Sequence, residues 1–432
     1  MSVSDFIKKC LRVPKRILMF FWNILLRVKS IIGNFRRVRR EFGWKYTFRL
    51  YRDKVKMKLR KPFSLPDFIE KELRSGSYKG VYVIPTIWWE TPIFQRPHQM
   101  ALAFLNMGYL VIYLEGPGPV YPAGSIRSPK KGLHVVTVLD YAKALQNVSG
   151  CIISFYSTSF TEYAATILTP EYRRRNQIVY EYIDHFDESI SGEGTATLKG
   201  GYELITAMDD VYFLASARCL QDDLAKKSGK SVMYVANGVD MEHYSAENIS
   251  AIQKNNTLPD VFKSNRVKIG YFGAMALWLD YGMINTVMKN HPEWDFIFIG
   301  PDYYGGINRL DRSLPNCHYI GPVEYKLLPG YASRFDVTIL PFERGDLAKS
   351  TSPLKLFEYF ALGKAVVVTP DLLECIGHPG VFVAGDAAAF AEAIEKALAV
   401  KDDPDFVSGQ MKTAADNSWM SRAQELEKGL TV

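Results

Sequence analysis

The sequence predicts an α/β protein built from two doubly wound parallel sheets and preceded by a basic helical arm. From Gly80 onward, short apolar runs alternate with segments of helical spacing, as in strands joined by crossover helices. The alternation stops in a polar stretch at 247–264 and restarts at Val267. Residues 1–62 instead mix basic and bulky apolar side chains. A chain of 432 residues is long enough for two such domains with full cores.

The basic arm carries 19 Lys and Arg residues against three acidic ones, whereas the whole chain has a net charge of only +7. Its apolar run, 17–26, would form a helix roughly 15 Å long, and a bilayer core needs about 30 Å. We therefore expect this helix to lie in the membrane interface, with Phe20, Phe21 and Trp22 in the lipid and the basic residues of 1–62 on anionic headgroups.

The composition of the arm is compatible with other partners. It could pack as a solvated helix on the body of the protein or on a sister subunit. Nucleic acid is not expected, because no nucleic-acid-binding fold accompanies the charge. The five cysteines are scattered and form no CxxC motif, which favours a reducing compartment and no zinc site. The expected location is cytoplasmic, attached peripherally to the inner face of the plasma membrane.

The first predicted sheet follows the arm. A strand is expected at 81–84, then a helix over 96–107 that ends before Gly108, then a second strand at 110–114. The Asn237-Gly238 turn signal closes this domain. The further expected strands are 133–138, 151–155, 178–182, 211–214 and 232–235.

The second predicted sheet begins at Val267 and is followed by an amphipathic helix over 387–399. Its expected strands are 269–272, 296–299, 318–320, 337–340, 365–368 and 381–383. The predicted organisation is therefore an arm (1–75), a first domain (76–245), a linker (246–265), a second domain (266–400) and a C-terminal helix that crosses back (401–432).

The stretch 350–370 organises the second domain. Pro353 suits the first turn of a helix, Gly363 supplies its end, and 365–368 reads as a buried parallel strand. We expect the helix to be capped by one of the polar residues before the proline, namely Ser350, Thr351 or Ser352.

This helix would point its N-terminus at a sheet edge, where free N–H groups and the positive end of the dipole attract phosphate. Lys355 adds a positive charge in the first turn, and Glu358 is placed to accept hydrogen bonds from ribose hydroxyls. Gly273, at the end of the first strand, lets the backbone approach phosphates closely. The expected nucleotide site comprises Gly273, Ala274, Ser352, Pro353, Leu354, Lys355 and Glu358.

This stretch, Pro353-Leu-Lys-Leu-Phe-Glu-Tyr-Phe-Ala-Leu-Gly-Lys-Ala-Val-Val, resembles the donor-binding helix of the GT-B glycosyltransferases, in particular the retaining family 4 (group 1) enzymes. The likeness spans roughly residues 78–425 and is greatest to bacterial surface-polysaccharide enzymes of the teichuronic acid biosynthesis type. The other similar motifs, in the family's order, are Gln95-Arg-Pro-His-Gln-Met-Ala, Asn237-Gly-Val-Asp240, Ile269-Gly-Tyr-Phe-Gly-Ala, Phe298-Ile-Gly-Pro301, 316–321 and 335–342.

The resemblance implies two Rossmann-like domains facing a cleft. It also implies transfer of a sugar, with retention, from a nucleotide diphosphate sugar to a saccharide acceptor, which we expect to be lipid-linked. UDP is the expected nucleotide, with GDP or dTDP open. Same-face attack is preferred over double displacement, since the sequence shows no clear inward nucleophile. No metal is expected, because Asp403-Pro-Asp405, a formal DxD match, falls in a late polar turn.

Two departures from the family pattern concern the donor. The family's second glutamate, eight positions before Glu358, is Ser350 here. The basic residues that follow the first strand of the second domain in the family are absent from 274–280. Lys349, Lys355 or Arg344 is expected to substitute for them.

The first domain supplies the remaining candidates. Trp88 and Trp89 suit stacking on a sugar, and Glu90 and Arg96 suit gripping its hydroxyls or a phosphate. Asp184 and His185 end another strand and could contact the donor sugar or move a proton. We assign catalytic roles to Glu90, Arg96, Asp184 and His185. The alternatives are a nucleotide-sugar epimerase of the same fold and a catalytically silent scaffold, for which Ser350 is the best support.

Overall fold

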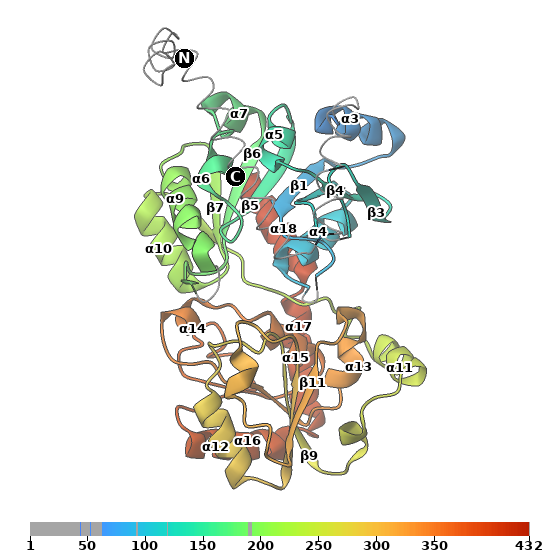
Figure 1. Ribbon diagram of the computed structural model, residues 1–432, viewed down its shortest axis with the longest axis vertical. Coiled ribbons are helices and arrows are strands. Elements are labelled where there is room, and N and C mark those ends of the chain that lie inside the picture. Colours follow the sequence, from blue (N-terminus) through green and yellow to red (C-terminus); the bar gives the residue numbers. More distant parts are fainter. Residues whose placement is uncertain are drawn as a thin grey trace, which may run out of the picture. The chain divides into compact units, whose positions relative to one another are not determined.

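The computed structural model describes residues 44, 52, 63–91, 94–118, 120–188 and 192–431 of the chain (Figure 1). The chain forms two compact units, of which the larger (64–116, 126–136 and 140–432) contains nearly all of the described secondary structure. The smaller unit comprises 1–63, 117–125 and 137–139. In its described part, the Gly124 N–H donates to the Thr137 carbonyl oxygen (2.7 Å). The interfacial helix expected within 17–26 lies outside the described residues.

The first sheet has eight strands in the order β3-β4-β2-β1-β5-β6-β7-β8. Strand β3 pairs antiparallel with β4, and the pairs β2-β1, β1-β5, β5-β6, β6-β7 and β7-β8 are parallel. The central strands are apolar and buried, because helices flank a parallel sheet on both faces. The strands are β1 (Val81–Thr86), β2 (Leu110–Glu115), β3 (Ile126–Lys130), β4 (Leu133–Thr137), β5 (Cys151–Tyr156), β6 (Gln177–Tyr182), β7 (Val211–Ala215) and β8 (Val232–Tyr234). The helices are α3 (Leu65–Ser75), α4 (Arg96–Asn106), α5 (Tyr141–Leu145), α6 (Glu162–Ala165), α7 (Pro170–Arg175), η1 (Gly192–Gly194), α9 (Thr195–Thr206) and α10 (Arg218–Ser228).

The second sheet has six parallel strands in the order β11-β10-β9-β12-β13-β14. Its strands are β9 (Val267–Phe272), β10 (Trp294–Ile299), β11 (Cys317–Gly321), β12 (Val337–Leu340), β13 (Val366–Val368) and β14 (Val381–Val383). The helices of this half are α11 (Ala246–Asn255), η2 (Asp260–Lys263), α12 (Tyr281–Asn290), η3 (Gly306–Arg309), η4 (Tyr325–Leu327), α13 (Leu328–Ala332), α14 (Asp346–Ser350), α15 (Leu354–Ala361) and α16 (Ala387–Val400).

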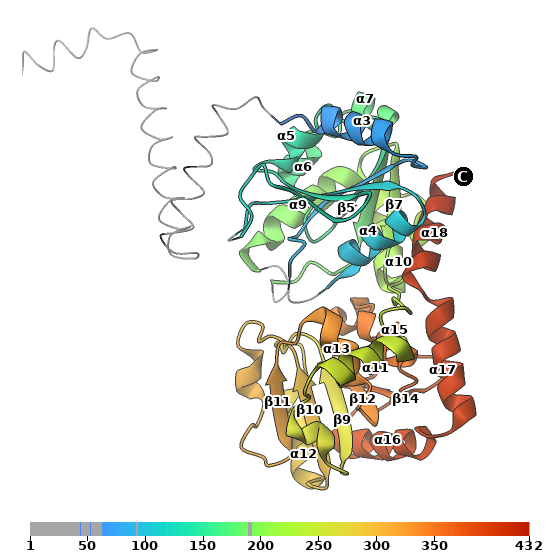
Figure 2. The ribbon, with the colours of Figure 1, turned by 90° about the vertical axis from the view of Figure 1, so that its right-hand side faces the viewer.

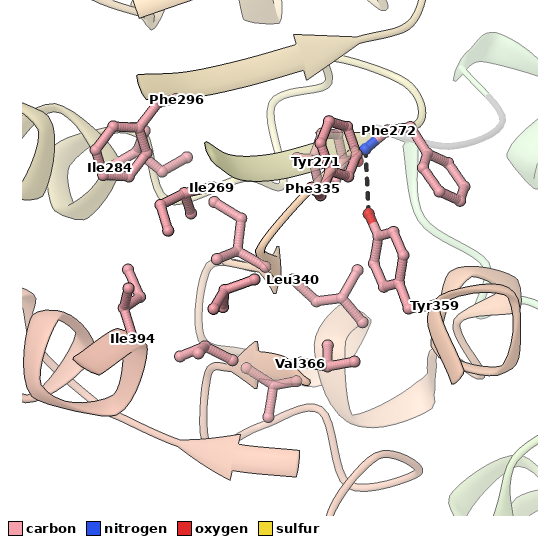
Figure 3. Packing of buried hydrophobic residues seen from close by; sticks show 14 of the residues in the cluster. Ile269, Tyr271, Phe272, Ile284, Phe296, Phe335, Leu340, Tyr359, Val366 and Ile394 are labelled. Carbon is pink, nitrogen blue, oxygen red and sulfur yellow. Dashed lines mark hydrogen bonds between the residues drawn. The ribbon is translucent and has the colours of Figure 1, made fainter. Parts of the chain in front are cut away.

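The core of the second sheet explains why α15 has a fixed position. Tyr359 of α15 is fully buried, and its hydroxyl accepts a hydrogen bond from the Phe272 N–H at the end of β9 (3.1 Å, Figure 3). The Phe272 and Tyr359 rings pack edge to face at 4.7 Å. Helix α15 is therefore held against the carboxyl end of β9.

The last two helices, α17 (Pro404–Asp416) and α18 (Trp419–Leu430), pack on different parts of the larger unit (Figure 2). Helix α17 packs against α15, and α18 packs against α4. Trp419, Ala423, Leu426 and Leu430 of α18 join the hydrophobic core of the first sheet. The C-terminal segment thus contributes to the first sheet although it follows the second.

Most of the predicted elements are confirmed, including all expected parallel strands. Edge strand β3 was not predicted, because Ile126–Lys130 is exposed on an edge and lacks the apolar pattern of the buried strands. The polar stretch at 247–264 was expected to be a linker, but 246–255 forms α11. Its Ser245 side chain caps the helix by accepting from Asn248 N (3.3 Å), and Ile252 is buried. Among the described residues, no helix is both long and apolar enough to span a membrane.

Candidate functional site

Helix α15 begins at Leu354, with Pro353 as its N-cap, and the chain turns at Gly363, whose φ is +67°. The expected side-chain cap was wrong. Ser350 ends α14, and its hydroxyl donates to the Leu347 carbonyl oxygen (3.1 Å). The Thr351 hydroxyl donates to the same oxygen (2.6 Å). No side chain caps the helix. The Leu356 N–H donates to the Pro353 carbonyl oxygen (3.2 Å), which leaves the N–H groups of Leu354 and Lys355 at the helix start for a ligand.

Gly273 lies directly against Lys355 at the carboxyl end of β9. Its φ of +140° favours glycine. A β-carbon at this position would lie 2.1 Å from Lys355 Cε and 2.8 Å from Nζ, so any side chain here would displace the end of the Lys355 side chain. The structure therefore brings together Gly273 and Lys355, which are more than 80 positions apart in the sequence.

Glu358 is 7% exposed, and burial raises the pKa of its carboxyl to about 7, although Lys355 and Tyr244 act in the opposite direction. Burial lowers the pKa of Lys355, and Glu358 opposes this shift. The Lys355 ammonium and the Glu358 carboxylate thus stabilise each other's charge in a poorly solvated site. Such a carboxylate gains from hydrogen-bond donors such as ribose hydroxyls, and such an ammonium gains from a phosphate.

The cations expected to substitute for the missing basic residues differ in placement. Lys355 lies over Gly273, as described. Lys349 Nζ lies 3.3 Å from Asp346, and Arg344 Nε lies 3.7 Å from Asp371. Of the three, Lys355 is the cation that lies at the carboxyl end of β9, against Gly273.

Arg96 is 2% exposed, and its guanidinium forms a buried ion pair with Glu181 on β6 (Nε to Oε2, 2.8 Å). The Nη1 group donates to the Ala236 carbonyl oxygen (3.0 Å) and to Asn237 Oδ1 (3.2 Å). Within the described part of the chain, Arg96 Nη2 and Glu181 Oε1 have no hydrogen-bond partner. This placement favours a role in positioning the chain at 236–237 rather than direct contact with a substrate.

The loop after β1 is anchored toward β2 and β3. Trp88 Nε1 donates to the Gly116 carbonyl oxygen (3.0 Å) while 39% of the residue stays exposed. The Trp89 N–H donates to Glu115 (2.9 Å), and its ring packs on Tyr113 at 5.1 Å. Glu90 forms an exposed ion pair with Arg127 of β3 (2.6 Å). Trp88 therefore offers an open ring, whereas Trp89 is a packing residue and the Glu90 carboxylate is already paired.

Asp184 and His185 follow β6, which lies two strands from β1 on the side away from β2. His185 is exposed and Asp184 is half-buried. Burial raises the pKa of Asp184 to about 7. Like the tryptophan loop, both residues follow the carboxyl end of a parallel strand. The raised pKa is what a group that exchanges a proton near neutral pH requires.

Asn237 is a residue whose role the sequence did not reveal. Its side chain donates to the Ser352 carbonyl oxygen (2.6 Å), and its N–H donates to Ser352 Oγ (3.3 Å). Asn237 thereby links Arg96 to the residue that precedes the α15 N-cap. The Asn-Gly signal predicted only a turn, because the partners come from distant parts of the chain. Tyr244, buried beside Glu358, was missed for the same reason.

The Asp403-Pro-Asp405 sequence has a local structural role. The Asp403 side chain accepts hydrogen bonds from the N–H groups of Asp405 (2.9 Å) and Phe406 (3.4 Å), as the N-cap of α17. The helix cap accounts for this DxD match.

The chain is similar to known proteins in sequence and in fold. Residues 268–400 match the family described as "Glycosyl transferases group 1". A Bacillus subtilis (strain 168) protein, named provisionally as the teichuronic acid biosynthesis glycosyltransferase TuaH, is 28% identical over 273 residues. That match covers 59% of this chain and 66% of the relative, so the chain covers about two thirds of the relative's length.

Solved structures show the same fold at low sequence identity. Sucrose-phosphate synthase from Thermosynechococcus elongatus has a TM-score of 0.61 at 14% identity, with 81% of this chain and 98% of that chain covered. Alr3699/HepE of Anabaena, solved in complex with UDP, has a TM-score of 0.55 at 14% identity, with 81% and 99% covered.

The fold is thus that of the GT-B glycosyltransferases, and the predicted fold class is confirmed. Residues 268–400, which carry Gly273, Lys355 and Glu358, match the group 1 glycosyltransferases, as the resemblance implied. The family and the named relative are both glycosyltransferases and support a transferase enzyme.

Proposed function

We propose that this protein is a retaining glycosyltransferase that moves a sugar from a nucleotide diphosphate sugar to a saccharide acceptor in surface-polysaccharide biosynthesis. The observation that carries the proposal is the uncapped start of α15, with Lys355 over Gly273 and Glu358 buried one turn along the helix. The match of 268–400 and the relative named for teichuronic acid biosynthesis support it.

Each donor-site residue has a distinct task in the proposal. The first N–H groups of α15 and the Lys355 ammonium stabilise the diphosphate as its charge grows during departure. Gly273 lets the phosphates approach the backbone, and Glu358 accepts hydrogen bonds from the ribose. Ala274, Ser352, Pro353 and Leu354 complete the proposed donor site. UDP is the proposed nucleotide, supported by the UDP complex of HepE.

The first domain contributes acceptor-side groups in the proposal. Asp184, with its pKa near 7, exchanges a proton with the sugar hydroxyls, and His185 lies beside it. Trp88 stacks on the acceptor. Retention is proposed to occur by same-face attack guided by the leaving phosphate.

The test is mass-spectrometric turnover of a panel of UDP-, GDP- and dTDP-sugars. The assay is run with and without lipid-linked acceptor extract, for wild type and Glu358→Ala. Loss of one donor with sugar added to the acceptor, in the wild type only, is expected. Donor conversion without acceptor would identify an epimerase instead. Silence of folded wild type across the panel would favour a scaffold.

The acceptor is proposed to be lipid-linked and met at the inner face of the plasma membrane. The basic composition of 1–62 supports this, although that segment lies outside the described residues apart from Trp44 and Arg52. Co-sedimentation with anionic phosphatidylglycerol vesicles, compared with neutral phosphatidylcholine vesicles, tests it. A full-length, active protein that fails to sediment with anionic vesicles would refute this attachment.

A further inference from the structure

Two neighbouring loops in the second domain carry three aromatic side chains, Trp278, Tyr303 and Tyr304, here called the aromatic cluster. The Trp278 and Tyr303 ring centroids lie 5.5 Å apart, and those of Tyr303 and Tyr304 lie 4.6 Å apart with the rings nearly perpendicular (73°). Tyr304 is 62% exposed. Tyr304 therefore presents its ring to solvent, whereas Trp278 is partly buried and packs against the core of the second sheet.

The loops that carry the cluster are fastened to each other. The Met275 N–H donates to the Pro301 carbonyl oxygen (2.9 Å), and the Tyr303 N–H donates to the Met275 carbonyl oxygen (3.0 Å). A β-carbon on Gly306 would lie 2.4 Å from that same Met275 oxygen, so the loops approach as closely as glycine allows. Met275 is two residues beyond Gly273. The rings are thus held on a rigid frame beside the proposed diphosphate site.

The backbone of Tyr304 is strained. Its φ of +53° lies in the left-handed region, which costs free energy for a residue with a β-carbon. Glycine or asparagine would adopt this conformation more easily. The exposed ring recovers little of this cost by packing. Backbone strain of this kind is concentrated at ligand sites, which indicates that the Tyr304 ring contacts a ligand.

The segment of the first domain that contains Asp184 and Gly192 approaches the cluster. Burial, Tyr304 and Asp184 together raise the pKa of Tyr303, so Asp184 is close enough to act on it electrostatically. A β-carbon on Gly192, in the same inter-strand segment as Asp184, would lie 3.3 Å from the Tyr304 hydroxyl oxygen. Aromatic faces beside a carboxylate suit a pyranose, whose C–H face packs on rings and whose hydroxyls donate to oxygen.

We propose that Trp278, Tyr303 and Tyr304 form a stacking platform for the pyranose ring of a substrate sugar. The inference rests on the proposed glycosyl transfer and names the part of the site that recognises the sugar. The segment 274–280 carries no basic residue, which fits contact with an uncharged ring better than with a diphosphate. The sugar can be that of the donor or that of the acceptor.

Two measurements distinguish these sources. Calorimetry gives the affinities for UDP, UDP-glucose, UDP-galactose and UDP-N-acetylglucosamine, with the GDP- and dTDP-hexoses of the transfer panel added. Transfer to the lipid-linked acceptor extract gives the dependence on acceptor concentration. The variants are Trp278→Leu, Tyr304→Asn, which tolerates the left-handed backbone but lacks the ring, and Tyr304→Phe, which keeps the ring. Tyr163→Asn, at a tyrosine 57% exposed on α6, is the matched control.

If the platform binds the donor sugar, Trp278→Leu and Tyr304→Asn weaken binding of the sugar nucleotide at least fivefold but leave binding of the free nucleotide unchanged. If it binds the acceptor, the same variants raise the acceptor concentration at half-maximal rate at least fivefold. Tyr304→Phe should restore most of either loss, and Tyr304→Asn should melt no earlier than wild type.

The outcomes also separate this inference from the proposed function. An active wild type whose cluster variants stay within twofold of Tyr163→Asn in both measurements would overturn the platform alone. A folded wild type that turns over no sugar nucleotide of the panel would overturn the proposed function, and the platform with it.

Discussion

Replacing Arg96 by methionine tests whether this residue positions the chain or contacts substrate. The change keeps an aliphatic side chain but removes the guanidinium from its buried pair with Glu181 (2.8 Å) and from Ala236 and Asn237. Removing one partner of a buried ion pair costs about 4 kcal/mol, because the other charge stays buried and unpaired. Each kilocalorie lowers the melting temperature of a domain of this size by about 2 to 4 °C. We therefore expect a decrease of about 8 to 16 °C.

The assay is thermal unfolding followed by circular dichroism, with urea unfolding as a second measure. The double variant Arg96→Met/Glu181→Gln should be more stable than Arg96→Met alone, because the orphaned charge is gone. Arg174→Met, at an exposed arginine on α7, should change the free energy of unfolding by no more than about 0.5 kcal/mol. If Arg96→Met unfolds like wild type while sugar transfer is abolished, the positioning role is wrong and Arg96 contacts substrate.

Three further predictions concern the proposed donor site. Because burial raises the pKa of Glu358 from 4.5 to about 7, the folded protein keeps a proton between these pH values that the unfolded chain loses, and stability falls as pH rises through that window. The free energy of unfolding of Glu358→Gln, measured in urea relative to that of wild type, should therefore rise by about 3 kcal/mol from pH 5 to pH 8. The same difference between variant and wild type at both pH values would contradict the raised pKa. Gly273→Ala should displace Lys355 and weaken sugar-nucleotide binding, measured by calorimetry, at least tenfold. The control Gly409→Ala, where nothing lies within 4 Å of the added carbon, should leave the affinity unchanged. Equal affinities of the two variants would argue against a close approach of the phosphates to the backbone at Gly273. Asn237→Ala should cost about 2 kcal/mol in urea unfolding, since it leaves buried groups unpaired, and a change below about 0.5 kcal/mol would show that the link to Ser352 contributes little.

Local pattern was sufficient for most of the fold. Parallel strands buried on both faces read as continuous apolar runs, so β5 and β13 were predictable without any partner. Strand β3 was not predictable, because an exposed edge strand is defined by its pairing with β4 and not by its own composition. Helix α11 was missed because its sequence is mostly polar and only Ile252 among its residues is buried.

In the candidate site, too, the residues of one contiguous segment were predictable, and those whose partners are distant in the sequence were not. The start of α15, with Lys355 and Glu358 three positions apart, is contained in one contiguous segment, and the sequence alone placed it. Arg96 could not be interpreted this way, because an arginine before a proline looks the same whether it faces a ligand or a buried carboxylate. The difference is decided by Glu181, 85 residues away.

The sequence by itself determined the class of fold, the order of its elements and the helix that begins the proposed donor site, because these follow from short-range periodicity and turn chemistry. The tertiary structure decided which polar groups are paired with each other and which remain available. It showed Arg96 and Glu90 engaged in ion pairs, Lys355 against Gly273, and the rings of Trp278, Tyr303 and Tyr304 packed together. The physical reason is that burial and electrostatic pairing depend on distances between residues far apart in the chain, and composition and spacing do not contain those distances.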